Sequence, residues 1–129
     1  MAELSDQDPD DALSAVMADL SASARRSNLV RCEQLGEALD AIAARQLPPA
    51  GRLEAASVAH QVVGSAGTFG YRRVSSLAAA LEEYLAGTGP ADPAQGRVDA
   101  VAHEQARRQL AQMVDALQSA PAGGHQSDG

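Results

Sequence analysis

Apolar residues recur every three to four positions along most of this chain, which is the spacing of amphipathic α-helices. Five stretches carry such a stripe: Leu13-Val16-Met17-Leu20, Cys32-Leu35-Leu39-Ile42, Ala55-Val58-Val62-Ala66, Val74-Leu77-Ala78-Leu81-Leu85 and Ala102-Ala106-Leu110-Val114-Leu117. No stretch shows the alternation of β-branched and polar residues that is typical of a strand. The pattern therefore predicts an all-α protein.

Prolines and glycines separate these stripes into helices. Asp8-Pro9 and Asp92-Pro93 each join a capping residue to a proline, so each predicts a helix start. Leu47-Pro48-Pro49 predicts a helix end, because a residue before proline avoids the α-helical region. Gly87 and Pro90 predict the end of the next-to-last helix. The third and fourth helices are thus expected at about 51–67 and 71–86.

The links between these helices are short, which favours antiparallel neighbours. We therefore predict an antiparallel up-and-down four-helix bundle over residues 9–119, with an additional N-terminal helical segment. Ser27-Asn28 marks a soft spot where the first two stripes could kink or divide. Residues 1–8 are polar and acidic and residues 120–129 have no periodicity, so both are expected to be disordered tails.

Composition narrows the class of protein further. The 129 residues fit one domain, and with no Trp and one Phe the core must come from small and aliphatic side chains. The formal net charge of −7 argues against nucleic acid as a partner, because phosphate binding needs clustered Lys and Arg. No apolar run approaches the roughly 18 residues of a membrane-spanning helix, so a cytoplasmic protein without a membrane partner is expected. Cys32, the only cysteine, is expected to be a small buried hydrophobe.

His60 lies on a predicted helix that is apolar on two sides. Ala55, Val58, Val62 and Ala66 form one stripe, and His60 projects from nearly the opposite side. A helix that is apolar all round can simply be buried, which would make His60 a core histidine. Gly64 supports the other interpretation, an exposed imidazole, because a glycine inside a helix costs about 1 kcal/mol relative to alanine. It lies one turn after His60 and leaves space beside the ring, although close helix packing could also require it.

A longer pattern extends from His60 across two predicted helices. Glycine and serine follow the histidine by four and five positions, a second glycine by ten, and apolar residues and an acidic residue continue on the next helix. The residues are His60, Gly64, Ser65, Gly70, Val74, Leu77, Leu81 and Glu82. This 23-residue pattern resembles that of the histidine phosphotransfer (HPt) domain, the relay module of multistep two-component signalling.

The resemblance implies a function as well as a fold. His60 would accept a phosphoryl group from the phosphoaspartate of a receiver domain, or from a histidine kinase, and pass it to another receiver. The partners would be receiver domains of response regulators or hybrid histidine kinases. The receiver would bring Mg²⁺, so no cofactor is expected on this chain, which would be a carrier rather than an enzyme. A monomer is expected.

The resemblance also suggests roles for residues around His60. The predicted turn at residues 68–70 brings His60 and Glu82 to similar heights, so Glu82 could orient the imidazole through Nδ1, or it could be an ordinary solvated surface glutamate. Gly70 would serve the turn between the two helices. An apolar ring around His60 would be the surface on which a receiver docks. Its members are Leu53, Ala56, Val63, Gly64 and Gly67. Ser65 is expected to be a helix residue at the edge of this surface.

One position departs from the family pattern. Family members usually carry a lysine three residues after the histidine, and this chain has Val63. Arg72 and Arg73 could supply the missing positive charge, although they could equally be ordinary surface arginines. The valine keeps open a second hypothesis, an adaptor of the same fold that binds a kinase or receiver without being phosphorylated. A third hypothesis is a helical dimerisation module in which His60 is buried.

The other two histidines show no comparable pattern. His103 is expected at the boundary of the bundle, and His125 lies in the C-terminal tail. Three scattered histidines and a single cysteine do not form a metal-binding motif. There is also no nucleophile elbow and no phosphate-binding glycine loop.

Overall fold

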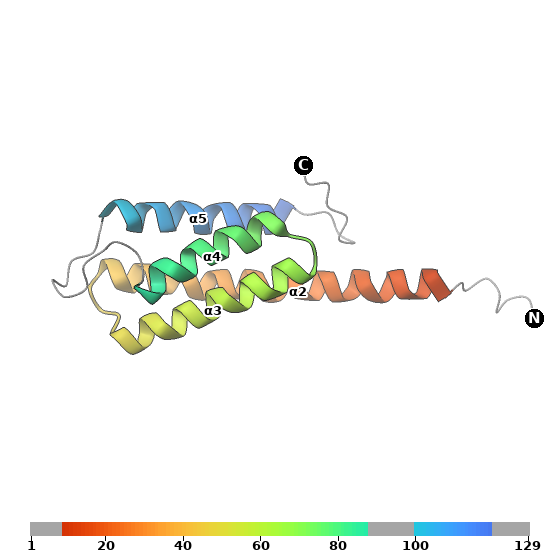
Figure 1. Cartoon of the computed structure of the whole chain (residues 1–129), viewed down its shortest axis with the longest axis horizontal. Helices are drawn as coiled ribbons and strands as arrows, with labels where there is room; N and C mark the ends of the chain where they lie inside the picture. Colours follow the sequence, from red (N-terminus) through yellow and green to blue (C-terminus); the bar gives the residue numbers. More distant parts are fainter. Residues whose placement is uncertain (1–8, 88–99, 120–129) are drawn as a thin grey trace, which may run out of the picture.

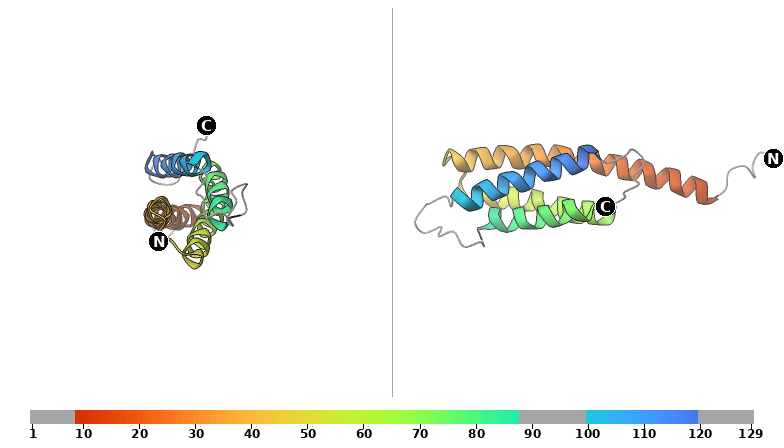
Figure 2. Two further views of the ribbon diagram at one scale, coloured as in Figure 1. Left: turned by 90° about the vertical axis from the view of Figure 1, so that its left-hand side faces the viewer. Right: turned by 90° about the horizontal axis from the view of Figure 1, so that it is seen from above.

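The computed structural model describes residues 9–87 and 100–119, which form four antiparallel helices (Figure 1). They are α2 (Pro9–Ala43), α3 (Pro49–Thr68), α4 (Arg72–Ala86) and α5 (Ala100–Ser119). Contacts join α2 to α3, α3 to α4, α4 to α5 and α5 back to α2, so each helix packs between two neighbours (Figure 2). The predicted all-α bundle is confirmed. The two predicted tails and the helix start at Asp92-Pro93 lie outside the described residues.

The first two apolar stripes belong to one continuous helix, so the chain is not divided at Ser27-Asn28, where the sequence suggested a kink or a division. Asn28 is 1% exposed, and its Nδ2 donates a hydrogen bond to Ser65 Oγ at 3.2 Å. The side chain therefore bonds to α3 instead of competing for the backbone of its own helix. The N-terminal part of α2 projects past the ends of the other helices (Figure 1), and this projection is the additional segment that the sequence predicted.

The core is built from small and aliphatic side chains, as the composition predicted. Its largest fully buried apolar residues are Leu35, Leu39, Val62, Val74, Leu81, Leu85, Met113 and Leu117. Cys32 is 2% exposed, and burial raises the pKa of its thiol to about 11. The thiol therefore stays protonated at neutral pH and packs as the small hydrophobe that the sequence predicted.

The turn between α3 and α4 fixes how the two helices face each other. Tyr71 donates its backbone N–H to the carbonyl of Ala66 at 2.8 Å, which closes the end of α3. Gly70 has a φ of 87°, a left-handed conformation that favours glycine. This turn lets α4 run back along α3, so residues at similar distances from the turn lie beside each other.

His103 is buried, not at the edge of the bundle as the sequence predicted. It is 9% exposed, and its Nδ1 lies 2.8 Å from the hydroxyl oxygen of Tyr84 on α4. Burial, and after it the positive charge of Arg107, lowers the pKa of His103. The ring is therefore neutral at neutral pH, and it serves the contact between α4 and α5.

Arg52 of α3 holds the C-terminal end of α4. Its NH2 donates to the carbonyl of Tyr84 at 2.6 Å and its Nε to that of Leu85 at 3.2 Å, while the guanidinium lies 5.2 Å from the centre of the Tyr84 ring. These carbonyls belong to the last turn of α4, where few helical N–H groups remain to bond them; the carbonyl of Tyr84 also accepts the backbone N–H of Gly87 at 3.2 Å. A cation at this end also interacts favourably with the helix dipole.

Replacing Arg52 by methionine should lower the free energy of unfolding by about 1–2 kcal/mol, near the lower end for hydrogen bonds to charged groups because Arg52 is partly exposed. Urea unfolding followed by circular dichroism would measure the change. The matched control is Arg108→Met on α5, where the guanidinium only reaches Glu104 at 3.9 Å on the surface. Equal effects of both substitutions would contradict the assigned role of Arg52.

Candidate functional site

The middle of α3 presents His60 to solvent. The side chain of His60 is 73% exposed, whereas Ala59 and Val62 on the opposite side of the same helix are fully buried. The hypothesis that His60 is a core histidine of the bundle is therefore wrong. An exposed imidazole offers its nitrogens to an incoming molecule.

Glu82 of α4 approaches the Nδ1 edge of the His60 ring. The distances from Nδ1 to the two carboxylate oxygens are 3.2 and 3.3 Å, and the side chain of Glu82 is 34% exposed. In the tautomer that donates the Nδ1 proton to this carboxylate, Nε2 keeps its lone pair and faces away from Glu82. The arrangement therefore favours Nε2 as the reactive atom.

Gly64 leaves open space one turn after His60. A Cβ added at Gly64 would meet nothing within 4 Å, so the glycine is not required by packing within the chain. Thr68 donates its hydroxyl to the carbonyl of Gly64 at 2.9 Å, and the helix continues through this position. The absence of a side chain at Gly64 therefore leaves room for a binding partner or for the His60 ring itself.

The structure brings most of the predicted apolar ring to one surface. Leu53 is 63% exposed, Gly64 and Gly67 are exposed, and Val63 is half-buried. The expected exposure of Ala56 is wrong, because this residue is only 7% exposed and belongs to the core. Ala56 lies one turn after Arg52, on the side of α3 from which Arg52 reaches α4. Its short methyl group does not extend to the solvent on this side.

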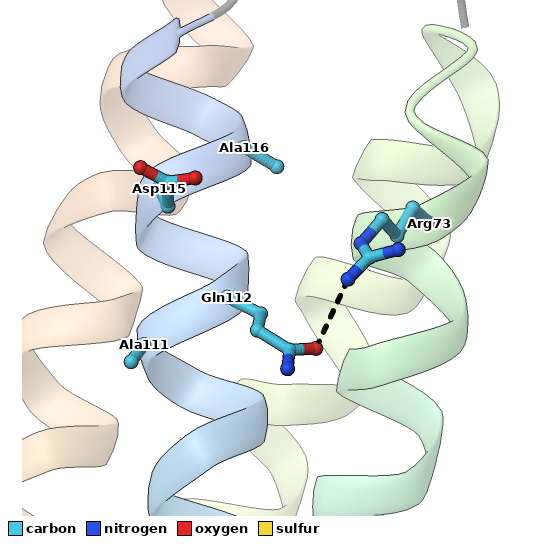
Figure 3. Close-up of a pocket in the computed structure, with 5 residues that line it drawn as sticks. All are labelled: Arg73, Ala111, Gln112, Asp115 and Ala116. Carbon is cyan, nitrogen blue, oxygen red and sulfur yellow. Dashed lines mark hydrogen bonds between the residues drawn. The ribbon is translucent and has the colours of Figure 1, made fainter. Parts of the chain in front are cut away.

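Arg73 does not lie beside His60. Its NH2 donates to Gln112 Oε1 of α5 at 3.2 Å, over a shallow groove between α4 and α5 (Figure 3). Arg72 is exposed at the start of α4. Both arginines precede Glu82 by nine or ten residues, which is about 15 Å along the helix axis at 1.5 Å per residue. The structure therefore does not place the positive charge of Arg72 or Arg73 beside His60.

A different arginine lies close to the site. Arg31 of α2 donates from Nε to Gln61 Oε1 at 3.1 Å and from NH1 to Asn28 Oδ1 at 2.8 Å. Gln61 is the residue after His60, and Asn28 in turn bonds Ser65. The sequence pattern did not single out Arg31, because its partner on α3 is 30 residues away.

Two further observations describe the chain around this site. In residues 9–87 and 100–119, no three His, Cys, Asp or Glu side chains gather closely enough to hold a metal ion. None of the described helices combines the length and the apolar character needed to cross a membrane.

Comparison with known proteins gives one match. A family model described as "Hpt domain" matches residues 17–120. The matched range contains His60, Glu82 and all of α3, α4 and α5, together with α2 from residue 17. No curated protein and no solved structure matched the chain.

Proposed function

Because this chain belongs to the Hpt domain family, whose members carry phosphoryl groups on histidine in phosphorelays, we propose that His60 accepts and donates the phosphoryl group. The donor is the phosphoaspartate of a receiver domain or a histidine kinase, and the acceptor is the aspartate of another receiver. The chain acts as a carrier, and the receiver supplies Mg²⁺ and the groups that polarise the phosphoryl oxygens.

The observation that carries this proposal is the environment of His60. The imidazole is exposed on the middle of a helix, its Nδ1 edge is occupied by Glu82, and the space over Gly64 is open. Attack in line on phosphorus needs an accessible nitrogen with a free lone pair, which this arrangement leaves at Nε2. A histidine placed to pack or to bind a metal would have no need of this clearance.

The proposed step exchanges one bond to phosphorus for another. The Nε2 lone pair of His60 attacks the phosphorus of the acyl phosphate, and the aspartate carboxylate leaves with the electron pair of the P–O bond. The imidazolium formed keeps its proton on Nδ1, where the carboxylate of Glu82 stabilises the positive charge. The reverse step returns the phosphoryl group to an aspartate.

The test is transfer of label from phosphorylated receivers to the purified chain. A panel of receiver domains is phosphorylated with ³²P, freed of donor and mixed with the chain in Mg²⁺. Label that is lost in acid and stable in base would identify phosphohistidine. If no receiver transfers label to the chain, the carrier function is wrong.

An adaptor of the same fold is the second candidate, favoured by Val63 in place of the usual lysine. It predicts that receivers bind the chain, as measured by calorimetry, without transferring label. Binding with no label in the panel would therefore select the adaptor, whereas binding with label would reject it.

Replacing Glu82 by glutamine should slow phosphoryl transfer about tenfold. The amide no longer stabilises a charged ring, and the His60 ring is less firmly oriented for attack. The rate is measured by quenched-flow transfer from a saturating phosphorylated receiver. Glu83→Gln is the matched control, because Glu83 is the exposed neighbour on the same helix and does not face His60. Equal slowing by both substitutions would show that the effect is one of net charge alone.

Arg31 should supply positive charge that Val63 does not. The Arg31 guanidinium bonds to Gln61, the residue after His60, on the side of α3 away from Glu82. We expect its positive charge to attract a phosphoryl group on Nε2. Arg31→Gln is expected to lower the transfer rate about three- to tenfold, and Arg73→Gln to leave it unchanged. Transfer assays with both variants would decide, and loss only in Arg73→Gln would overturn the assignment.

A further inference from the structure

Asn28 is a polar residue within the buried side of α2. It is 1% exposed, and the positions that follow it on the same side of the helix, Cys32 and Leu35, are buried as well. Burying an amide costs free energy unless its polar atoms are hydrogen-bonded, and an aliphatic residue at this position would avoid that cost. Packing alone therefore does not account for an asparagine here.

Both ends of the Asn28 amide are hydrogen-bonded. Nδ2 donates to Ser65 Oγ of α3 at 3.2 Å, and Oδ1 accepts from NH1 of Arg31 at 2.8 Å. A guanidinium only donates, so the amide oxygen must face Arg31 and the amide nitrogen must face Ser65. Arg31 also donates from Nε to Gln61 Oε1 of α3 at 3.1 Å. Ser65, Asn28, Arg31 and Gln61 thus form one chain of hydrogen bonds, which we call the Asn28 network.

The Asn28 network lies level with His60. Its two hydrogen bonds between α2 and α3 join residues in the same antiparallel register. This register places His60 level with residues 32–33 of α2, so Arg31 is one or two residues away, or about 1.5–3 Å along the helix axis. The network thus holds a positive charge at the height of the imidazole, on the side of α3 away from Glu82.

Of the two acceptors that hold Arg31, Asn28 is the firmer one. Gln61 is an exposed side chain, whereas Asn28 is buried and itself tied to α3. A long arginine side chain loses rotamer freedom when it is held in one position, so it needs a fixed partner. Without Asn28, the guanidinium would keep only its bond to an exposed glutamine.

We propose that Asn28 is a positioning residue for phosphoryl transfer at His60. It acts through Arg31, whose guanidinium it fixes where the positive charge attracts the phosphoryl group. This role rests on the proposed function, because it serves the same transfer. The amide does not touch the reacting atoms, so its removal should affect the reaction only as far as Arg31 does.

Labelling by ³²P-phosphoramidate tests this role without a receiver. Nε2 forms the bond to phosphorus, and ammonia leaves with the electron pair of the P–N bond. Asn28→Ala and Arg31→Gln should each slow the labelling about three- to tenfold, with the label on His60→Gln subtracted as background. The double variant should be no slower than Arg31→Gln alone. Unchanged labelling of Asn28→Ala, or a further slowing of the double variant by the same factor, would overturn the proposal.

The matched control for stability is Cys32→Ala. Cys32 is buried in the core one turn after Asn28, so both substitutions should lower the free energy of unfolding in urea, but only Asn28→Ala should slow labelling. Equal slowing by both would show that Asn28 only stabilises the bundle. If Asn28→Ala does not fold, Asn28→Leu, which refills the buried side of α2 with an aliphatic side chain, takes its place in every measurement.

Salt dependence gives a readout that a purely structural role would not change. Added KCl should slow labelling of the unsubstituted chain, because it screens the attraction between Arg31 and the anionic phosphoramidate. This dependence should be weaker in Asn28→Ala and in Arg31→Gln alike. A salt dependence in Asn28→Ala equal to that of the unsubstituted chain would mean that the amide only ties α2 to α3, and the proposal would be wrong.

The phosphoramidate assay also separates this role from the proposed carrier function. If phosphoramidate labels His60 and no receiver does, the carrier function is wrong, while the double variant still decides the role of Asn28. If phosphoramidate leaves His60 unlabelled, the ring is not a phosphoryl acceptor, and both proposals are wrong.

Discussion

Replacing His60 by glutamine is expected to abolish phosphoryl labelling of the chain while leaving its fold intact. Glutamine has no nucleophilic ring nitrogen, so the N–P bond cannot form. The side chain is 73% exposed and its described partner is the partly exposed Glu82, so the free energy of unfolding should change by less than about 0.5 kcal/mol. Labelling with a ³²P-phosphorylated receiver and urea unfolding of the same preparation measure the two quantities.

The matched control is His103→Gln. His103 is buried against Tyr84, so its replacement should lower stability but leave labelling in place. Label that persists in His60→Gln and disappears in His103→Gln would show that the acceptor was assigned wrongly. Receiver binding by His60→Gln, followed by calorimetry, separates loss of the acceptor from loss of docking.

The helices and the position of His60 could be predicted because they depend on local spacing. Apolar residues three and four apart define a helix face, and prolines and glycines define its ends. His60 and Glu82 lie at similar distances from the turn at Gly70, so a simple helical hairpin already brings their helices level. The structure adds the distance between Nδ1 and the carboxylate.

The errors concern residues whose surroundings depend on another helix. Ala56 was predicted to be exposed, but it is buried in the core, on the side of α3 from which Arg52 reaches α4. Arg73 is close to the site along the chain but points to Gln112 of α5. Arg31 is remote in sequence and was missed, although it bonds the residue after His60.

The exposure of Leu13, Val16, Met17 and Leu20 on α2 also depends on the other helices. These four apolar residues follow the spacing of the buried stripes, so periodicity alone cannot distinguish them from core residues. Whether a helix face is covered depends on where the neighbouring helices end. That property belongs to the assembled bundle, and it is visible only when the ends of α3, α4 and α5 are compared with the start of α2 (Figure 1).

Replacing Gly64 by leucine should make the chain more stable and a much poorer phosphoryl acceptor. A leucine in place of glycine inside a helix adds about 0.5–1 kcal/mol. Gly64 is exposed and a Cβ there meets nothing within 4 Å, so the first side-chain atom causes no clash and the rest can extend into solvent. The same side chain would fill the open space beside His60 over which we propose that a receiver docks. Because a displacement of about 1 Å at the reacting atoms can cost a factor of 10², the transfer rate should fall about 100-fold.

The opposite signs of these two effects make the Gly64 substitution informative. Most substitutions that impair activity also destabilise a protein, so a loss of transfer in a stabilised chain points to a surface reserved for a partner. Gly64→Ala should keep most of the stability gain with a smaller loss of transfer, which would relate the loss to side-chain size. Ala111→Leu on α5, which does not contact α3, is the control for an added exposed leucine. Unchanged transfer in Gly64→Leu, measured by quenched flow alongside urea unfolding, would mean that receivers approach His60 from another side and that the glycine is incidental to docking.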